Sequence, residues 1–211
     1  PSLLSGIGSV PSSKSHTLRA IVFATLAHGE SIIHNVLPSP DTEAMIRACI
    51  ALGAKIRSEK KSLFITGTGG NLSTPLNVID VGNSGQALRF IGAIATLAPH
   101  HTILTGDNSI CTLRPVAPLL DGLTQLGASA ISSKSDSHAP IIVKGPAKTG
   151  KITVDGKDSQ PVSALLMLAA MLEGTTTIEV TNPGETPWIG MTLYLLKRMG
   201  VEFSNDNYHT Y

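Results

Sequence analysis

A repeat with a period of about 74 residues restricts the fold of this sequence more than any other feature. Three helical patterns end at a glycine, and these glycines lie 74 and 73 residues apart, in the segments Leu52-Gly53-Ala54, Leu126-Gly127-Ala128 and Met199-Gly200-Val201. Glycine is typical just past a last helical turn, because it takes the left-handed backbone conformation there without steric strain. A second helix type repeats as well, since Ala24-Thr25-Leu26-Ala27 recurs as Ala95-Thr96-Leu97-Ala98. Two helix types that share one period predict a fold built from copies of one unit.

Each copy reads as a β-α-β-α-β-β unit, so the predicted fold class is α+β. The three units span about 6–75, 76–150 and 151–211. First strands are expected at 7–10, 76–81 and 152–155, and the apolar helices that follow them at 14–27, 85–98 and 161–172. Second strands are expected at 31–36, 102–105 and 175–180, and amphipathic helices at 42–52, 116–126 and 189–199. Because no linker-like stretch divides the units, we expect a single domain over 1–211, in which three pseudo-symmetric units surround a shared helical core.

A hairpin is expected to close each of the first two units, at 55–58 with 62–66 and at 128–132 with 141–144. The third unit is predicted to be incomplete. Its first hairpin strand is expected at 201–204 and a turn at 205–207, which leaves 208–211 only to begin the second strand. By the logic of the repeat the chain stops within a unit, and we expect an unpaired strand edge there.

Composition excludes several classes of function. The formal net charge of +1 argues against a nucleic-acid surface, which needs many unpaired cations. No apolar run is long enough to span a membrane, and no charged-then-apolar leader opens the chain. Cys49 and Cys111 lie in no metal-ligand spacing and are expected to be reduced, which favours the cytoplasm. The seven histidines form no HxxxH pattern, so no metal site is predicted.

Three strand-to-helix loops carry the candidate site residues. They are Ser12-Ser13-Lys14-Ser15, Gly82-Asn83-Ser84-Gly85-Gln86 and Gly156-Lys157-Asp158-Ser159-Gln160. Each offers backbone amides and small polar side chains at a helix start, where anions bind. Lys14 and Arg19 add positive charge and are expected to face solvent, and Gly85 permits a ligand to approach the backbone closely. Helix capping would explain any one loop, but the internal symmetry brings the three together, which predicts a shared pocket for an anion.

Three residues outside these loops leave alternatives open. Arg114 precedes a helix that starts at a proline, where it could bind a phosphate or carboxylate or pack on the surface. Cys111 could act as a nucleophile, although no base lies nearby in the sequence and a small packing residue is favoured. Trp188, the single tryptophan, is either a packing anchor or a residue that leans on a ligand.

Four motifs resemble those of the 5-enolpyruvylshikimate-3-phosphate synthase family and occur in the family order. The segment Val-Pro-Ser-Ser-Lys-Ser-His-Thr-Leu-Arg at 10–19 resembles VPGSKSxxxR, and Gly-Asn-Ser-Gly-Gln-Ala-Leu-Arg at 82–89 resembles GN[AS]GTxxR. Leu104-Thr105-Gly106-Asp107 with Arg114-Pro115 resembles LTGD…RP, and Asp158-Ser159-Gln160 is similar to SSQ. The three-unit repeat also matches one lobe of that two-lobed fold.

The resemblance implies transfer of the enolpyruvyl group of phosphoenolpyruvate to the 5-hydroxyl of shikimate 3-phosphate, with release of phosphate and without a cofactor. Lys14 would be the catalytic residue, placed between the two substrates. The implied substrate-binding residues are Ser15 and Arg19 for the shikimate carboxylate, Gly85 and Arg114 for phosphoenolpyruvate, Ser159 and Gln160 for the sugar-like substrate, and Trp188 for stacking. The family's second lobe has no counterpart in this sequence, so it is the implied missing partner, and this chain alone is expected to be inactive.

The sequence departs from the family pattern at several positions: Ser13 replaces Gly, Gln86 replaces Thr, Asp158 and Glu185 replace Ser, and Trp188 replaces Tyr. Two carboxylates near a phosphate would repel it unless they point away or pair with cations such as Lys157. Two other readings stay open. A UDP-N-acetylglucosamine enolpyruvyl transferase would use a Lys-Asn pair and a loop cysteine, but Lys14 is followed by Ser15. A non-catalytic half-transferase would only bind an anion or a partner.

Overall fold

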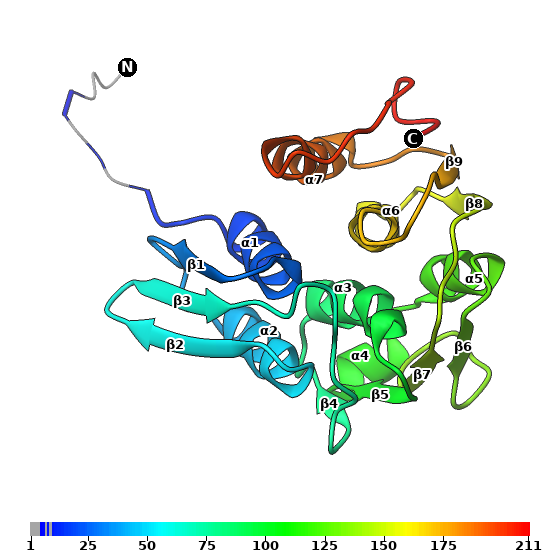
Figure 1. The fold of residues 1–211 in the computed structure, drawn as a ribbon, viewed down its shortest axis with the longest axis horizontal. Helices are drawn as coiled ribbons and strands as arrows, with labels where there is room; N and C mark the ends of the chain where they lie inside the picture. Colours follow the sequence, from blue (N-terminus) through cyan, green and yellow to red (C-terminus); the bar gives the residue numbers. More distant parts are fainter. Residues whose placement is uncertain (1–4, 7, 9) are drawn as a thin grey trace.

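The computed structural model describes residues 5, 6, 8 and 10–211, and it confirms the α+β class. Three separate sheets lie around the outside of the molecule, and helices fill the space between them (Figure 1). The strand orders are β1-β3-β2, β4-β5-β7-β6 and β8-β9. One sheet therefore belongs to each third of the chain, as the sequence repeat predicts.

The first third runs α1 (Lys14–Leu26), β1 (Glu30–Ile33), α2 (Pro40–Ala51), β2 (Lys55–Glu59) and β3 (Ser62–Thr66). Helix α1 begins where the Ser13 side chain accepts a hydrogen bond from the His16 backbone amide, and α2 begins with the same arrangement at Ser39 and Thr42. The expected hairpin forms between β2 and β3, with Ser58 opposite Leu63. The first strand expected at 7–10 includes positions 7 and 9, which lie outside the described residues.

The second third runs β4 (Ile79–Asp80), α3 (Gly85–Ile94), the 3₁₀ turn η1 (Ala95–Leu97), β5 (Thr102–Thr105), α4 (Asn108–Thr112), α5 (Ala117–Gln125), β6 (Ser129–Ser132) and β7 (Ile141–Lys144). The sequence predicts no helix at 108–112. The short helix α4 forms there because the Asp107 carboxylate caps it, accepting from the Ile110 amide at 3.0 Å. The strand expected at 76–81 shrinks to two residues, and Leu76 before it is fully exposed.

The last third runs β8 (Lys151–Asp155), α6 (Ser159–Ala169), β9 (Thr177–Thr181) and α7 (Thr186–Arg198). The strand predicted at 201–204 is wrong, because these residues pair with no other strand among those described. The end of the chain instead lies beside β9 (Figure 1). Ile178 and Tyr211 exchange two backbone hydrogen bonds of 3.0 Å, and the Val180 amide donates to His209 O at 2.8 Å. Residues 208–211 were expected to begin a second hairpin strand beside 201–204, and instead the final residues cover one edge of β9.

Helices α3 and α6 form the centre of the core, which explains their sequences. Every residue of α3 except Gln86 is buried, and in α6 only Gln160 and Ala169 are not. A helix that is apolar on all sides must be surrounded by other elements, and small residues such as Gly92 and Ala164 let these elements approach closely. Gln86 and Gln160 are not buried, and both lie in the first turn of their helix, where the candidate site loops end. None of the described helices is long and apolar enough to cross a membrane.

Candidate functional site

The first turns of α1, α3 and α6 meet at one open pocket of about 250 Å³. Its lining residues are Lys14, Ser15, Asp41, Asn83, Gly85, Gln86, Arg114, Ser159, Gln160, Glu185 and Trp188. The structure brings together seven of the eight site residues that the sequence suggests, and only Arg19 is not among the lining residues. Three helix N-termini that point at one space concentrate positive backbone dipole there, which favours an anionic ligand.

Capping and ligand binding use different residues in these loops. Ser13, Ser84 and Asp158 each cap their own helix, accepting from a backbone amide two or three residues further on. A cap satisfies only one of the free amides in a first helical turn, so other amides remain for a ligand. The residues after the caps, which include Lys14, Gly85 and Ser159, line the pocket instead.

Lys14 is the half-exposed cation on one rim of the pocket. Its ammonium lies 3.4 Å from Asp41 Oδ2, and 47% of the Lys14 side chain is exposed. A surface ion pair of this length contributes little energy, so Lys14 can turn to a ligand. Beside it, Gln86 Nε2 donates to Ser15 Oγ at 3.5 Å, which connects the starts of α3 and α1. Gln86 Oε1 is buried and accepts no hydrogen bond from the residues that the structure describes.

Arg19 was expected at a solvent-facing helix start, and that expectation is wrong because the side chain is fully buried. Its guanidinium donates to Thr192 Oγ1 (2.8 Å), Trp188 O (3.0 Å), Ser15 O (3.2 Å) and Ser163 Oγ (3.3 Å). It also lies over the Phe90 ring, 5.1 Å from the centroid. Burial lowers the pKa of Arg19 to about 10, so it stays charged at neutral pH. Arg19 therefore fastens Ser15 and Trp188, and its direct contact with a substrate stays a prediction.

Arg89 is a functional candidate that the sequence analysis did not include among the site residues. It donates to Gly85 O (3.2 Å), Gln160 Oε1 (3.3 Å) and Pro115 O (2.8 Å), and it lies 3.1 Å from Asp158 Oδ2. Burial lowers the pKa of Arg89, the Asp158 carboxylate raises it, and the charge of Arg114 lowers it. The signal was present in the sequence. Arg89 lies four residues after Gly85 as Arg19 lies four after Ser15, and both donate 3.2 Å bonds to those carbonyls.

The carboxylates of Asp158 and Glu185, which lie near the start of α6, are both engaged, although not by Lys157. Asp158 caps α6 and pairs with Arg89, so it points away from the pocket centre. Glu185, on the loop before α7, accepts from Ser159 Oγ at 2.9 Å and from the Ser159 amide at 3.4 Å. The two carboxylates were expected either to point away from a phosphate or to pair with a cation. Asp158 does pair with a cation, which is Arg89 and not Lys157, whereas Glu185 accepts from the start of α6.

Arg114 is the second cation of the pocket and is exposed. Among the described residues it forms neither a hydrogen bond nor an ion pair, so its donors are free for a ligand. Its neighbour Gly85 leaves room for this, since a Cβ on Gly85 would lie 2.9 Å from Arg89 Nη1 and 3.8 Å from Arg114 Nη1. Any side chain at position 85 would fill the space in front of both guanidinium groups.

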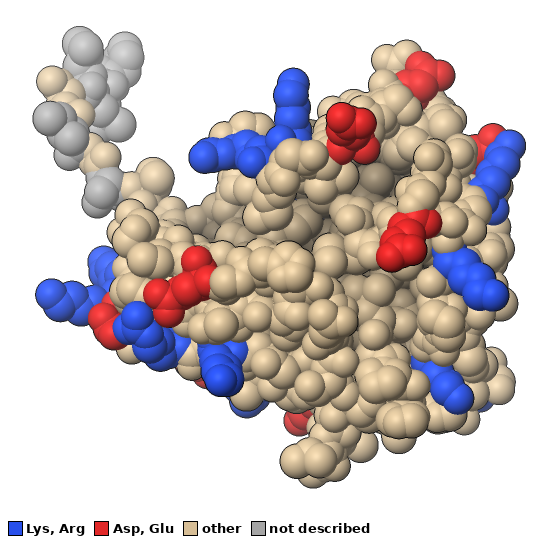
Figure 2. All heavy atoms as spheres, viewed as in Figure 1, with Lys and Arg blue, Asp and Glu red and all other residues tan. Residues whose placement is uncertain are grey.

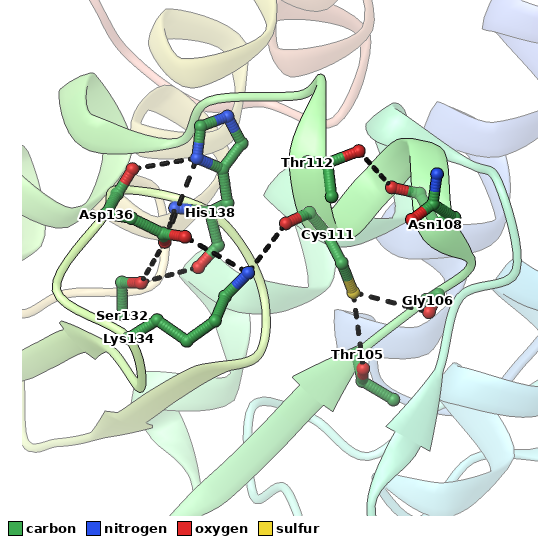
Figure 3. A network of polar contacts seen from close by, with 9 residues as sticks. All are labelled: Thr105, Gly106, Asn108, Cys111, Thr112, Ser132, Lys134, Asp136 and His138. Carbon is green, nitrogen blue, oxygen red and sulfur yellow. Dashed lines mark hydrogen bonds and ion pairs between the residues drawn. The ribbon is translucent and has the colours of Figure 1, made fainter.

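Cys111 lies on α4, ahead of Arg114, and does not line the pocket. Figure 3 shows its thiol directed at Gly106 O (3.4 Å) and Thr105 Oγ1 (3.8 Å), while Lys134 donates to Cys111 O at 2.9 Å. Lys134 also pairs with Asp136 at 3.0 Å. The loop after β6 thus holds the end of α4, and Cys111 is a half-buried packing residue.

Charge on the face of the molecule seen in Figure 2 is mixed. Figure 2 shows lysine and arginine side chains scattered among acidic ones over the visible face, with no single basic patch there. The pocket combines two cations, two carboxylates and three helix starts in an α+β fold, and helix starts with cations are groups that favour small anionic ligands.

Comparisons with known proteins identify this module. The family model for EPSP synthase (3-phosphoshikimate 1-carboxyvinyltransferase) matches residues 1–211, and the chain belongs to this family. The 3-phosphoshikimate 1-carboxyvinyltransferase of Acetivibrio thermocellus is 41% identical over 207 residues, and that of Chlamydia caviae is 42% identical over 212 residues. These matches cover 98% and 100% of this chain but 49% and 47% of the relatives. The chain spans about half the length of the curated relatives it matches.

A solved EPSP synthase from Acinetobacter baumannii has the same fold over this region. It superposes with a TM-score of 0.87 over 97% of this chain and 46% of its own length, at 23% sequence identity. At this identity the likeness supports the fold alone, and it agrees with a chain that corresponds to one part of a larger architecture.

Proposed function

We propose that this chain forms part of an enzyme that transfers the enolpyruvyl group of phosphoenolpyruvate to the 5-hydroxyl of shikimate 3-phosphate. The hydroxyl oxygen forms the new bond to C2 of the enolpyruvyl group. The bond from C2 to the phosphate oxygen breaks, and phosphate leaves with the proton of the hydroxyl. The observation that carries the proposal is the meeting of three helix starts with Lys14 and Arg114 at one pocket, because both substrates are small polyanions.

The proposed roles follow from the position of each side chain. Lys14 lines the pocket with a half-exposed ammonium, which suits a catalytic cation between the two substrates. Its task is to stabilise charge that develops at the reacting oxygen, and the proposed reaction needs no cofactor. Arg114 provides a bidentate donor pair for the phosphoenolpyruvate carboxylate or phosphate, with Gly85 leaving the space.

The remaining positions are assigned to shikimate 3-phosphate. Ser15 offers a hydroxyl beside Lys14, and the buried Arg19 guanidinium donates a hydrogen bond to the Ser15 carbonyl. Ser159 and Gln160 offer an amide, a hydroxyl and an amide side chain at the start of α6, with Trp188 as the neighbouring flat surface. Cys111 has no role in this scheme, which weighs against a cysteine-dependent transferase.

The second half of the longer relatives is the proposed partner of this pocket. The pocket is open, and both of its cations are substantially exposed, so water is not excluded from the ligand. A second lobe that closes over it would supply further charges and remove water. The cytoplasm is the proposed location, because both cysteines are free thiols.

Calorimetric titration with shikimate 3-phosphate, with UDP-N-acetylglucosamine as the alternative ligand, tests the proposal. The sample is a longer protein that carries residues 1–211 together with a second half like that of the relatives. We expect binding of the first compound only, and Lys14→Met should abolish phosphate release in the presence of phosphoenolpyruvate. Lys61→Met is the matched control, because Lys61 is an exposed lysine in the turn between β2 and β3 and lines no part of this pocket. Preference for UDP-N-acetylglucosamine, or full turnover by the Lys14→Met variant, contradicts the proposal.

A further inference from the structure

The carboxylate of Glu185 occupies donors at the start of α6 that an anionic ligand would use. It accepts from Ser159 Oγ at 2.9 Å and from the Ser159 backbone amide at 3.4 Å. Both residues line the pocket. The start of an α-helix that is 11 residues long thus already holds an anion, and this anion belongs to the protein itself.

The Glu185 carboxylate makes this contact and no other hydrogen bond or ion pair among the described residues. It stands at the N-cap position of α7, yet its side chain makes no capping hydrogen bond to that helix. Its backbone has a left-handed conformation (φ 47°, ψ 35°), which is uncommon for a residue with a Cβ. The residue is exposed, so its carboxylate can leave Ser159 for water without disturbing the core. A side chain with these properties can exchange places with a ligand.

The neighbouring Asp158 differs in each of these respects. Asp158 caps α6 through Oδ1 and pairs with the buried Arg89 through Oδ2, so both of its oxygens are engaged in holding the fold. The pocket itself has Lys14 and Arg114 as cations and Asp41 and Glu185 as carboxylates, which balance formally. Of these two carboxylates, Asp41 contacts Lys14, and Glu185 contacts the start of α6.

We propose that Glu185 is a specificity-determining residue that competes with the ligand phosphate for the Ser159 donors and is displaced when the ligand binds. The inference rests on the proposed function of the pocket as an anion site. Its consequence is a reduced affinity, because the fraction of molecules with free Ser159 donors sets the apparent dissociation constant. If Glu185 occupies these donors in about nine molecules of ten, removing it tightens phosphate binding about tenfold.

The test is a double-mutant cycle in the longer protein that contains this chain, with inorganic phosphate and shikimate 3-phosphate as separate titrants. Glu185→Ala should tighten binding of inorganic phosphate about tenfold when Ser159 is present. In the Ser159→Ala background the same change should have a much smaller effect, because the hydroxyl that Glu185 blocks is absent. Glu185→Gln, which keeps the side-chain length and removes the charge, should lie between Glu185→Ala and the unchanged protein.

Asp41→Asn is the matched control, since it removes one negative charge from the same pocket without touching Ser159. Its gain in affinity should be equal in the two backgrounds. Equal gains for Glu185→Ala in both backgrounds, or a loss of phosphate affinity, overturn the inference, because Glu185 would then act through charge alone or help to hold the ligand. Coupled gains with inorganic phosphate but no binding of shikimate 3-phosphate by any variant would support the inference and contradict the proposed function.

Discussion

At the scale of single residues, two buried arginines, Arg19 and Arg89, hold groups that belong to the pocket lining. Arg19 and Arg89 repeat one contact in two units, each donating to the carbonyl four residues earlier at the pocket edge. In the third unit the corresponding position is Ser163, whose hydroxyl accepts from Arg19 and from Thr192. The buried residues behind the pocket thus follow the internal repeat, and Arg19 contacts both the first unit, at Ser15, and the third unit, at Ser163.

Arg89 should be needed for both stability and ligand binding. Replacing it with Met leaves Asp158 without its partner and releases Pro115, Gln160 and Gly85 from a common donor. We expect a loss of about 2–3 kcal/mol in the free energy of unfolding, towards the lower end because Asp158 is partly exposed. Urea unfolding measures it, with Arg47→Met on the exposed side of α2 as the control, which should change stability by less than about 0.5 kcal/mol. Equal stability of the two variants would show that Arg89 is not a structural anchor.

At the scale of elements, six of the seven described α-helices and the two hairpins could be predicted because their signals are local. Small polar caps precede α1, α3 and α6, and a glycine with positive φ follows α2, α5 and α7. Burial of Arg19 could not be predicted, because its acceptors Ser163 and Thr192 lie 144 and 173 residues away. The helix α4 was missed because one carboxylate, that of Asp107, folds a polar segment with no apolar periodicity.

The glycine that follows β3 should tolerate no side chain. A Cβ on Gly67 would overlap the backbone oxygens of Ala24 and Ala27 at the end of α1, and backbone cannot move aside as a flexible side chain can. We expect Gly67→Ala to lower the free energy of unfolding by about 2–3 kcal/mol. Gly150 is the matched control, since a Cβ there would meet nothing within 4 Å. Gly150→Ala should be neutral or slightly stabilising by about 0.4–1 kcal/mol, and chemical denaturation of both variants decides the comparison.

The Asp136 carboxylate, in the loop between β6 and β7, should make the free energy of unfolding depend on pH in the acidic range. The His138 backbone amide, then the Lys134 ammonium, lower the pKa of Asp136 to about 2 from an ordinary value of 3.8 (Figure 3). A carboxyl group with a lowered pKa stabilises the folded state above pH 3.8, and this contribution is lost as the pH falls towards 2. The stability difference between the unchanged protein and Asp136→Asn should therefore be constant above about pH 5 and shrink between pH 4 and pH 2. A difference that does not change over this range contradicts the assignment.

At the scale of the whole molecule, the chain presents a well-packed core behind a binding surface that is open on one side. The helices α3 and α6 are buried almost completely, whereas Lys14 and Arg114 stand at the mouth of the pocket. The relatives are about twice as long as this chain, and their remaining half would lie outside the structure described. Stability and ligand closure are therefore expected to depend on different parts of the longer protein.

Binding by the isolated chain should be weak and sensitive to salt for this reason. Exposed cations are screened over about 10 Å at 0.1 M salt and about 3 Å at 1 M, whereas cations covered by a second lobe are screened much less. We expect the affinity of residues 1–211 for shikimate 3-phosphate to fall about tenfold between 0.05 M and 0.5 M NaCl, and that of the longer protein to fall clearly less. The isolated chain should also release no phosphate from the two substrates, while the longer protein does so with the same residues at 1–211. Melting curves confirm that each sample is folded at both salt concentrations. Steady phosphate release by residues 1–211 alone, or an equal salt dependence of the two proteins, would show that this chain closes its own pocket.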